Sequence, residues 1–276
     1  MVEWAVTGSS HSLLSLYYEV GHPMRYHRVR LHDSDDPHYR AHLARIMAGK
    51  QNHKPSRPAS NRAIFGNESE AIVRDWLSTF HPLSPRRFVE YDERMGKQLV
   101  RKYREIDAVF EYDARQLHVF EMKATSQARS ITRGIRQLNE TVAILAPLFP
   151  SIRATLMLVD TGIVTDAEVA VLMQQADAPP HAPYTIEQFY ADNPQIPCYD
   201  SHDYQPLHAP NLAVVRFPLA DIISRAEMMG MVLHLDWDEE DDDSEPEAPV
   251  THTSGAHDGE DDNPFAAALR NAGYSS

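Results

Sequence analysis

Residues 105–123 read EIDAVFEYDARQLHVFEMK. Both halves of this stretch are rich in valine, isoleucine, leucine and aromatic residues, which favour β-strands. The short interruption at residues 113–115 is typical of a turn. We therefore expect a β-hairpin that turns about Ala114, in which residues whose numbers add up to 228 lie opposite one another.

The register of this hairpin places charged side chains together. Asp107 faces Glu121, and Glu105 faces Lys123. Directly opposed β-carbons lie ~4.5–5.5 Å apart, so two carboxylates there repel one another. A hard divalent cation such as Mg²⁺ between Asp107 and Glu121 would remove this repulsion. Glu121 and Lys123 share one face of the strand, so the lysine would orient or deprotonate an attacking water.

Helical and strand patterns flank the hairpin in a definite order. Apolar residues recur at helical spacing in residues 67–80, with Asn67 as the expected N-cap, and again in residues 130–147. Strands are expected at residues 87–91, 100–112, 116–124 and 154–160. This order of helix, three strands, helix and strand predicts an α/β fold. After it we expect a helix at 166–176, a proline-broken segment at 178–211, a strand at 212–217 and a helix at 220–230.

Asp107 precedes Glu121-Met122-Lys123 by 13 intervening residues, and the two lie on neighbouring strands. This pattern resembles the D…(D/E)xK signature of the PD-(D/E)xK nuclease superfamily, with Ile106 in the place of the proline that gives the signature its name. The order of elements is similar to the αβββαβ core of that superfamily. The resemblance implies a restriction-endonuclease-like fold, in which a mixed central sheet is flanked by helices.

Two further motifs carry the resemblance. Residues 66–70, GNESE, are similar to the GxxxE opening of the first core helix. Arg136-Gln137-Leu138 resembles the QLxxY element of the RecB-like branch, with Thr141 in the place of the tyrosine. The resemblance covers about residues 66–160.

The resemblance implies a metal-dependent nuclease. Its implied ligands for Mg²⁺ or Mn²⁺ are Asp107, Glu121, the main-chain carbonyl of Met122, and Glu70. Lys123 would be the third catalytic residue beside the two carboxylates, and Gln137 would support the site. The substrate would be nucleic acid, with DNA favoured and RNA left open, in a repair, recombination or defence context.

Charge is distributed unevenly along the 276 residues, whose formal net charge is −14. Residues 1–136 carry a net charge of +6, residues 137–235 carry −8, and residues 236–262 hold 13 carboxylates and no lysine or arginine. A basic half beside an acidic half predicts a polyanionic partner. Three arginines of the second helix, at spacing i, i+4, i+7, would grip backbone phosphates: Arg129, Arg133 and Arg136. Five arginines nearer the N-terminus fit a nucleic-acid-binding arm and a solvated segment equally well: Arg25, Arg28, Arg30, Arg40 and Arg45.

Other classes are disfavoured by composition. The single cysteine, Cys198, excludes an intrachain disulfide, a Cys₄ zinc site and a cysteine-ligated iron–sulfur cluster. The histidines at 181, 202 and 208 lack the spacing of a zinc site. No stretch approaches the ~18 apolar residues of a membrane span, and the first residues lack the pattern of a signal peptide. A cytoplasmic protein without membrane contact is therefore expected.

We divide the chain into four parts. They are an accessory segment (1–60), a nuclease-like domain (61–235), an acidic disordered linker (236–262) and a short C-terminal helix (263–276). The acidic linker would compete with nucleic acid for the basic surface, so truncation after Leu235 should tighten binding at low ionic strength. Pro264-Phe265 offers the alternative that this tail recruits a protein partner. The sequence is also compatible with a homodimer.

Two alternatives to catalysis remain at this point. The charged residues of the hairpin would also suit a cross-strand ladder of ion pairs on an exposed face. A nuclease fold that has lost catalysis would serve as a nucleic-acid-binding or protein adaptor, because a fold does not fix a function.

Overall fold

The computed structural model describes residues 25–49, 61–175 and 178–235. Its strands are β1 (Tyr26–His32), β2 (Phe88–Met95), β3 (Gln98–Glu105), β4 (Ala108–Glu111), β5 (Gln116–Thr125), β6 (Ser151–Asp160), β7 (Cys198–Asp200) and β8 (Leu212–Pro218). Its helices are α2 (Pro37–Gly49), α3 (Asn61–Ser78), α4 (Arg129–Leu145), α5 (Asp166–Leu172), α6 (Ile186–Asp192), the 3₁₀ turn η1 (Pro206–His208) and α7 (Leu219–Met229). The expectations for the acidic linker and the C-terminal helix fall on residues 236–276, outside the described ranges.

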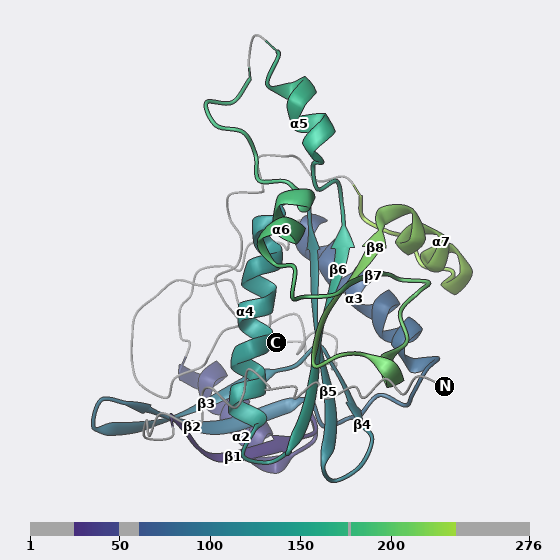
Figure 1. Ribbon diagram of the computed structural model, residues 1–276. Coiled ribbons are helices and arrows are strands. Elements are labelled where there is room, and N and C mark those ends of the chain that lie inside the picture. The colour runs from purple at the N-terminus through teal and green to yellow at the C-terminus, as the bar shows by residue number, and fades with distance from the viewer. Residues whose placement is uncertain (1–24, 50–60, 176–177, 236–276) are drawn as a thin grey trace, which may run out of the picture.

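A five-stranded sheet with the order β4-β5-β6-β8-β7 forms the centre of the fold. The β4–β5 pair is antiparallel, whereas β5, β6, β8 and β7 run parallel to one another. α4 covers one face of this sheet, and α3 and α7 cover the other (Figure 1). The prediction of a mixed α/β fold with a mixed sheet flanked by helices is confirmed at this level.

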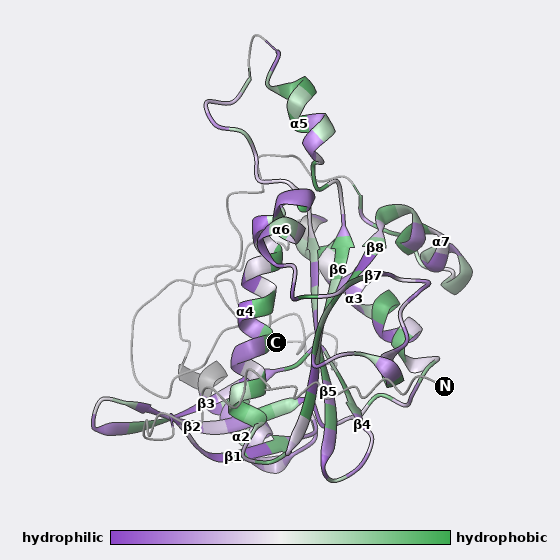
Figure 2. Ribbon diagram, in the orientation of Figure 1, coloured by the Kyte–Doolittle hydropathy of each residue, from purple (hydrophilic) through white to green (hydrophobic). Residues whose placement is uncertain are grey.

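The two faces of the sheet belong to separate apolar clusters because side chains alternate along each strand. Leu117 and Val119 of β5 pack toward Leu138 of α4. Phe120, from the same strand, packs on the opposite face with Trp76 of α3. Hydrophobic residues accordingly dominate the strands of this sheet, while the β2–β3 hairpin is mainly hydrophilic (Figure 2).

A second, antiparallel sheet with the order β1-β2-β3 lies beside the first. β1 and α2 fall in the segment that we expected to be accessory to the main domain. β1 nevertheless contributes Tyr26, Val29 and Leu31 to the apolar cluster that contains Val119. Residues 26–32 are thus an integral part of the core.

The predicted register of the central hairpin is confirmed where the strands pair. Ala108 lies opposite Phe120, and Glu111 lies opposite Leu117, so each pair of numbers adds up to 228. The expected single strand at residues 100–112 is wrong, because the chain changes sheets between β3 and β4. Glu105 consequently pairs with Phe88 of β2 and does not face Lys123.

The first core helix begins earlier than predicted. α3 starts at Asn61, so Asn67 is an exposed residue inside the helix and the predicted N-cap there is wrong. Phe65 is buried with Ile72, one helical repeat of seven residues later, and this burial favours the additional turns. Gly66 does not end the helix, since a glycine inside a helix costs only about 1 kcal/mol relative to alanine.

None of the helices in the described ranges has the length and apolar composition that a bilayer span needs.

Candidate functional site

The carboxylate of Asp107 is held directly against the strand that carries Glu121 and Lys123. Asp107 is the residue before β4, and its Oδ2 accepts a 2.6 Å hydrogen bond from the main-chain N–H of Met122. Burial raises the pKa of Asp107, and this hydrogen bond and the Lys123 ammonium oppose that rise. The predicted register made Glu121 the partner of Asp107, but Asp107 lies just before the paired strand and contacts this segment through the main chain of Met122.

Glu121 and Lys123 lie on the same face of β5, as alternation requires. The Lys123 Nζ lies 3.4 Å from the Glu121 Oε1, and the side chains are 30% and 13% exposed respectively. Burial, and next the nearby charge of Asp107, raise the pKa of Glu121 to about 8. α4 passes close to the lysine stem at Gly134, where an added β-carbon would lie 3.4 Å from the Lys123 Cγ.

Glu70 joins these residues from α3. Burial, followed by the charge of Asp107, raises the pKa of Glu70 to about 8. The charges of Glu70 and Glu121 are therefore both destabilised by the same carboxylate of Asp107. Three carboxylates from α3, β5 and the start of β4 thus share one partly desolvated region, and strongly raised pKa values of this kind are frequent at functional sites.

Two arginines that we did not single out from the sequence secure the break between β3 and β4. Arg74 donates to the main-chain carbonyl of Asp107. Arg87 lies 2.6 Å from Glu105 and donates to the carbonyls of Ile106 and Asp107 at 3.4 Å. These bonds occupy carbonyls at the point where the chain leaves one sheet for the other, so the arginines fix the backbone that carries the Asp107 side chain.

A third arginine, Arg104 of β3, is 4% exposed and links the small sheet to α4. Its guanidinium donates to the carbonyl of Gln137 at 3.2 Å and to the Thr141 Oγ1 at 3.0 Å, and it also bonds Glu140. Its positive charge lowers the pKa of Glu121 against the larger effect of burial. Arg104 therefore links Gln137, the predicted supporting residue, with Glu121, a predicted catalytic carboxylate.

Gln137 is 5% exposed on the inner face of α4. Its side-chain Oε1 is buried and accepts no hydrogen bond from the residues that the structure describes. A buried amide oxygen without a donor is uncommon in native proteins and frequently marks the place of a water or an ion.

The sequence contained a signal for only one of these arginines. Arg74 follows Glu70 by four residues, so helical periodicity places both on one face of α3. The contacts of Arg87 and Arg104 depend on how two sheets and a helix pack together. No local pattern reports that arrangement.

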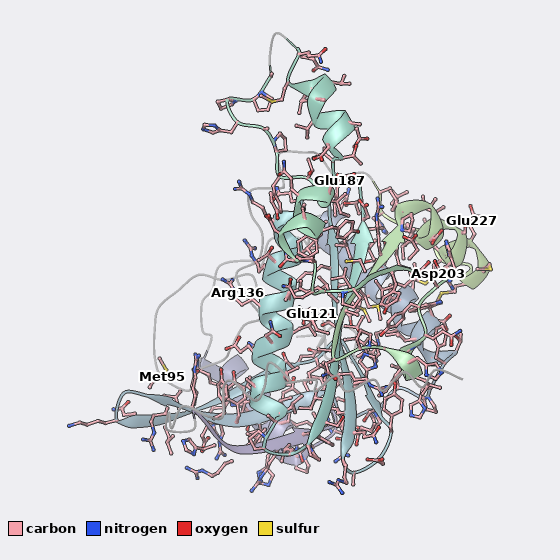
Figure 3. All side chains as sticks on the ribbon, in the orientation of Figure 1. Met95, Glu121, Arg136, Glu187, Asp203 and Glu227 are labelled. Atoms are coloured by element: carbon pink, nitrogen blue, oxygen red, sulfur yellow. The ribbon has the colours of Figure 1, made fainter. Side chains whose placement is uncertain are left out.

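The three arginines expected to grip phosphates lie along α4 and differ in exposure. Arg129 and Arg136 are exposed and Arg133 is half-buried on α4. Arg136 projects from the helix on the side away from Glu121 in the view of Figure 3. In the N-terminal set, Arg25 pairs with Glu93 and Arg28 pairs with Asp92. These carboxylate partners favour the solvated segment over the nucleic-acid arm for these two residues.

The predicted ligands are of the chemical type that a hard divalent cation prefers, but their side chains are not arranged around a metal position in this structure. Carboxylate oxygens are the donors that Mg²⁺ prefers, and the raised pKa values of Glu70 and Glu121 show that their negative charges lack full compensation. The described part of the chain contains no group of three or more His, Cys, Asp and Glu side chains that could hold a metal ion as it stands. Lys123 lies against Glu121, and Arg87 lies 3.7 Å from Glu70.

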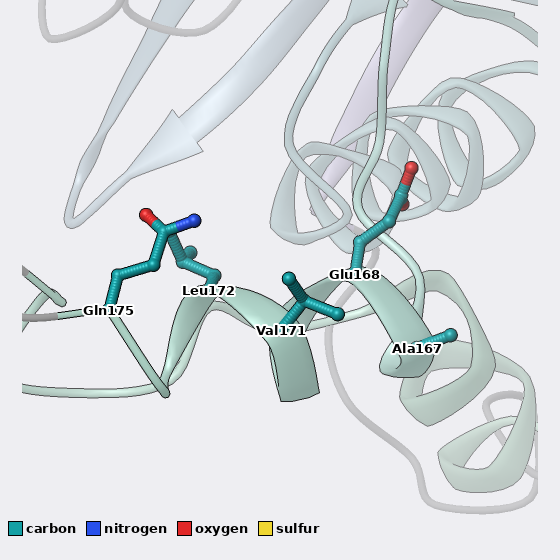
Figure 4. A pocket seen from close by; sticks show the side chains of 5 residues that line it. All are labelled: Ala167, Glu168, Val171, Leu172 and Gln175. Carbon is teal, nitrogen blue, oxygen red and sulfur yellow. The ribbon is translucent and has the colours of Figure 1, made fainter.

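A hollow of about 370 Å³ lies on α5, lined by Ala167, Glu168, Val171, Leu172 and Gln175 (Figure 4). None of the residues predicted to form the site lines this hollow.

No protein-family model matches the chain, and comparisons with curated proteins and with solved structures also found no match.

Proposed function

We propose that the chain hydrolyses phosphodiester bonds of nucleic acid, with DNA as the favoured substrate, in a reaction that requires Mg²⁺ or Mn²⁺. The observation that carries the proposal is the convergence of Glu70, Asp107 and Glu121 from three elements, with the pKa of two of them raised to about 8. The order α3, β2–β3, β4, β5, α4, β6 has one strand more than αβββαβ, because the strand expected at 100–112 is divided in two. The antiparallel β4–β5 pair, followed by α4 and the parallel strand β6, supports a restriction-endonuclease-like core. The confirmed 228 register supports the match of Asp107 to the first position of the D…(D/E)xK signature.

In this proposal Asp107 and Glu121 hold the metal, with help from the Met122 carbonyl and from Glu70. The bound ion would polarise the phosphate and lower the pKa of a water molecule bound to the ion. To reach it, Glu121 would turn from Lys123, and Glu70 would turn from Arg87. In each case the metal ion would replace the lysine or arginine as the positive charge beside the carboxylate. The negative charge of the carboxylate would therefore stay balanced.

Lys123 is the proposed catalytic cation. Its ammonium would orient the attacking water and offset the negative charge that develops on the phosphate. The water oxygen bonds to phosphorus, the ester P–O bond breaks, and the water supplies the protons for the two products. The orphaned amide oxygen of Gln137 would accept a hydrogen bond from a water at this site.

A binding module without catalysis is the second candidate, and one observation favours it. Four carboxylates, Glu70, Glu105, Asp107 and Glu121, are accompanied by four cations, Arg74, Arg87, Arg104 and Lys123. A network of matched charges can be purely structural.

One assay separates the two candidates. The purified chain is incubated with single-stranded, duplex and branched substrates, with and without Mg²⁺ or Mn²⁺, beside the Lys123→Ala variant. Divalent-dependent cleavage that the variant loses while it still binds the substrate supports the nuclease. Binding without cleavage under every condition supports the module.

A further inference from the structure

The β2–β3 hairpin projects well beyond the body of the molecule (Figure 1). Its strands pair without interruption from Phe88 opposite Glu105 to Met95 opposite Gln98. Gly96 takes a φ of 63° at the turn, a left-handed conformation that glycine adopts without strain. Residues 94–99, which we call the hairpin tip, are all exposed, whereas residues 88–93 are buried.

The hairpin tip differs in chemistry from the rest of its sheet. It reads RMGKQL and contains two cations and no carboxylate. Met95 is 52% exposed and Leu99 is 44% exposed, so the tip also presents two large apolar side chains to solvent. Figure 3 shows Met95 at the far end of the hairpin from Glu121.

Within the described ranges, the cations of the tip lack the carboxylate partners that the cations of the stem have. Arg101 pairs with Asp92 at 3.1 Å, and Lys102 pairs with Glu93 at 2.7 Å. Arg94 and Lys97 form no ion pair with any residue that the structure describes. A positive charge without a carboxylate partner, next to exposed apolar groups, complements the phosphates and base edges of a nucleic acid.

We propose that the hairpin tip is a binding element for duplex DNA, an inference that rests on the proposed function. A two-stranded ribbon fits a groove of B-form DNA, and methionine and leucine are among the side chains that proteins insert between base steps. Arg94 lies opposite Leu99 and Met95 lies opposite Gln98, so the two apolar side chains lie on opposite faces of the ribbon. With the ribbon inserted end-on into the groove, Arg94 and Lys97 contact phosphates, and Met95 and Leu99 contact bases from its two faces. The deep, narrow major groove of A-form RNA does not admit such a ribbon, so duplex RNA binds less tightly.

The proposed cleavage site and the tip lie on one continuous piece of chain. β3 runs from the tip at Gln98 to Glu105, two residues before Asp107. Its eight residues, at about 3.3 Å each, separate the tip from the carboxylates by roughly 25 Å. At 3.4 Å per base pair this corresponds to about seven base pairs. A duplex that runs along the hairpin would span this separation.

The test compares two variants of the full chain, Arg94→Ala/Lys97→Ala and Met95→Ser/Leu99→Ser. Controls carry Arg115→Ala, which removes one exposed cation at the β4–β5 turn, and Met228→Ser/Val232→Ser, which changes two apolar residues that are 77% and 82% exposed. Fluorescence anisotropy with a duplex DNA of about 30 base pairs is measured in EDTA across a salt series, and repeated with duplex RNA. Cleavage with Mg²⁺ is measured separately.

Each tip variant has its own expected signature. Loss of two phosphate contacts weakens binding about tenfold at low salt and lowers the slope of log K against log salt by about 2. Loss of the apolar pair weakens binding about tenfold and leaves the slope unchanged, because no counterion is released by an apolar contact. The controls bind as the parent does.

The inference is overturned if the parent binds duplex DNA and both tip variants bind it equally well, or if the tip variants change only self-association in sedimentation. If the parent cleaves DNA and the tip variants bind and cleave it equally well, the proposed nuclease is retained and the tip is not part of its DNA-binding surface. Tip-dependent binding without cleavage in Mg²⁺ would retain the inference and reject the nuclease.

Discussion

The main-chain N–H of Met122 donates to the Asp107 Oδ2 over 2.6 Å, so an aspartate at a strand break is fixed onto the centre of the neighbouring strand. This bond places a negative charge where it raises the pKa of both Glu70 and Glu121, after the larger effect of burial. Asp107 is therefore the one carboxylate whose charge acts on both Glu70 and Glu121.

Asp107→Asn tests this role, because the amide oxygen can still accept from Met122 while the charge is gone. We expect divalent-dependent cleavage to fall by at least about 10²-fold, as for loss of a charge-stabilising group. The pKa values of Glu70 and Glu121 should move down, and the melting temperature without metal should rise slightly, since like-charge repulsion is removed. Cleavage assays and thermal melts in EDTA measure both effects. Asp75→Asn, at an exposed position of α3, is the control, and cleavage by Asp107→Asn at the parent rate would rule out the proposed metal site.

The hairpin register was predictable from the sequence because it depends on a short loop and on local alternation. The ladder from Ala108 to Glu111 follows the 228 rule, which places Asp107 beside β5. The position of Glu105 was not predictable, because β3 pairs with β2 and belongs to another sheet. Nothing in the alternation of residues 100–112 marks that change of partner.

β1 shows a different limit. Its register shifts between His27 and Arg30, and Arg28 takes a φ of 49°. This irregularity puts Tyr26 and Val29 on the buried side three residues apart, which disrupts the period of two that identifies a strand. Its partner β2 also lies more than fifty residues further along the chain. The sequence of β1 therefore shows neither the alternation that identifies a strand nor the short connection that identifies a hairpin.

Stability should depend on pH in a direction that the carboxylates determine. The pKa values of Glu70 and Glu121 are raised from 4.5 to about 8, so the folded state keeps protons that the unfolded state has lost. The free energy of unfolding in EDTA should therefore fall as pH rises toward about 8. His118 acts oppositely, because burial lowers its pKa from 6.5 to about 3, but its contribution is complete above pH 6.5.

Thermal melts in EDTA between pH 6.5 and about pH 9 isolate the carboxylates from His118. Glu70→Gln/Glu121→Gln should flatten the fall. Added Mg²⁺ should stabilise the parent more at the upper end of this range, because a metal binds the deprotonated carboxylates. A melting temperature that stays constant or rises with pH in the parent would contradict the raised pKa values.

Lys123→Ala should lower single-turnover cleavage by about 10²-fold or more, because the charge beside the attacking water is lost. Metal affinity should be nearly unchanged when calorimetry is done at a pH above the carboxylate pKa values. Lys123→Arg keeps a positive charge but replaces the compact ammonium, so it should recover only part of the rate. If calorimetry instead shows that Lys123→Ala no longer binds metal, the lysine is part of a structural ion pair and the binding module is favoured.

Gly134 and Gly66 form a matched pair that tests how α4 is seated over Lys123. A β-carbon at Gly134 would lie 2.7 Å from the Leu156 Cδ1, and Leu156 is fully buried, so either the Leu156 side chain or α4 must shift. We expect Gly134→Ala to lower the free energy of unfolding by about 1–3 kcal/mol, the usual effect of overpacking a core. Cleavage should fall as well, since the same β-carbon also contacts the Lys123 Cγ.

Gly66→Ala introduces the same methyl group inside α3, where it meets no atom within 4 Å. The better helix propensity of alanine should raise the free energy of unfolding by about 0.5–1 kcal/mol, with cleavage unchanged. Urea unfolding of both variants, with the slope m compared to confirm a common two-state transition, gives the two changes directly. Equal stability of Gly134→Ala and Gly66→Ala would mean that α4 does not press on β6 at Leu156, and that its contact cannot be what holds the Lys123 stem in place.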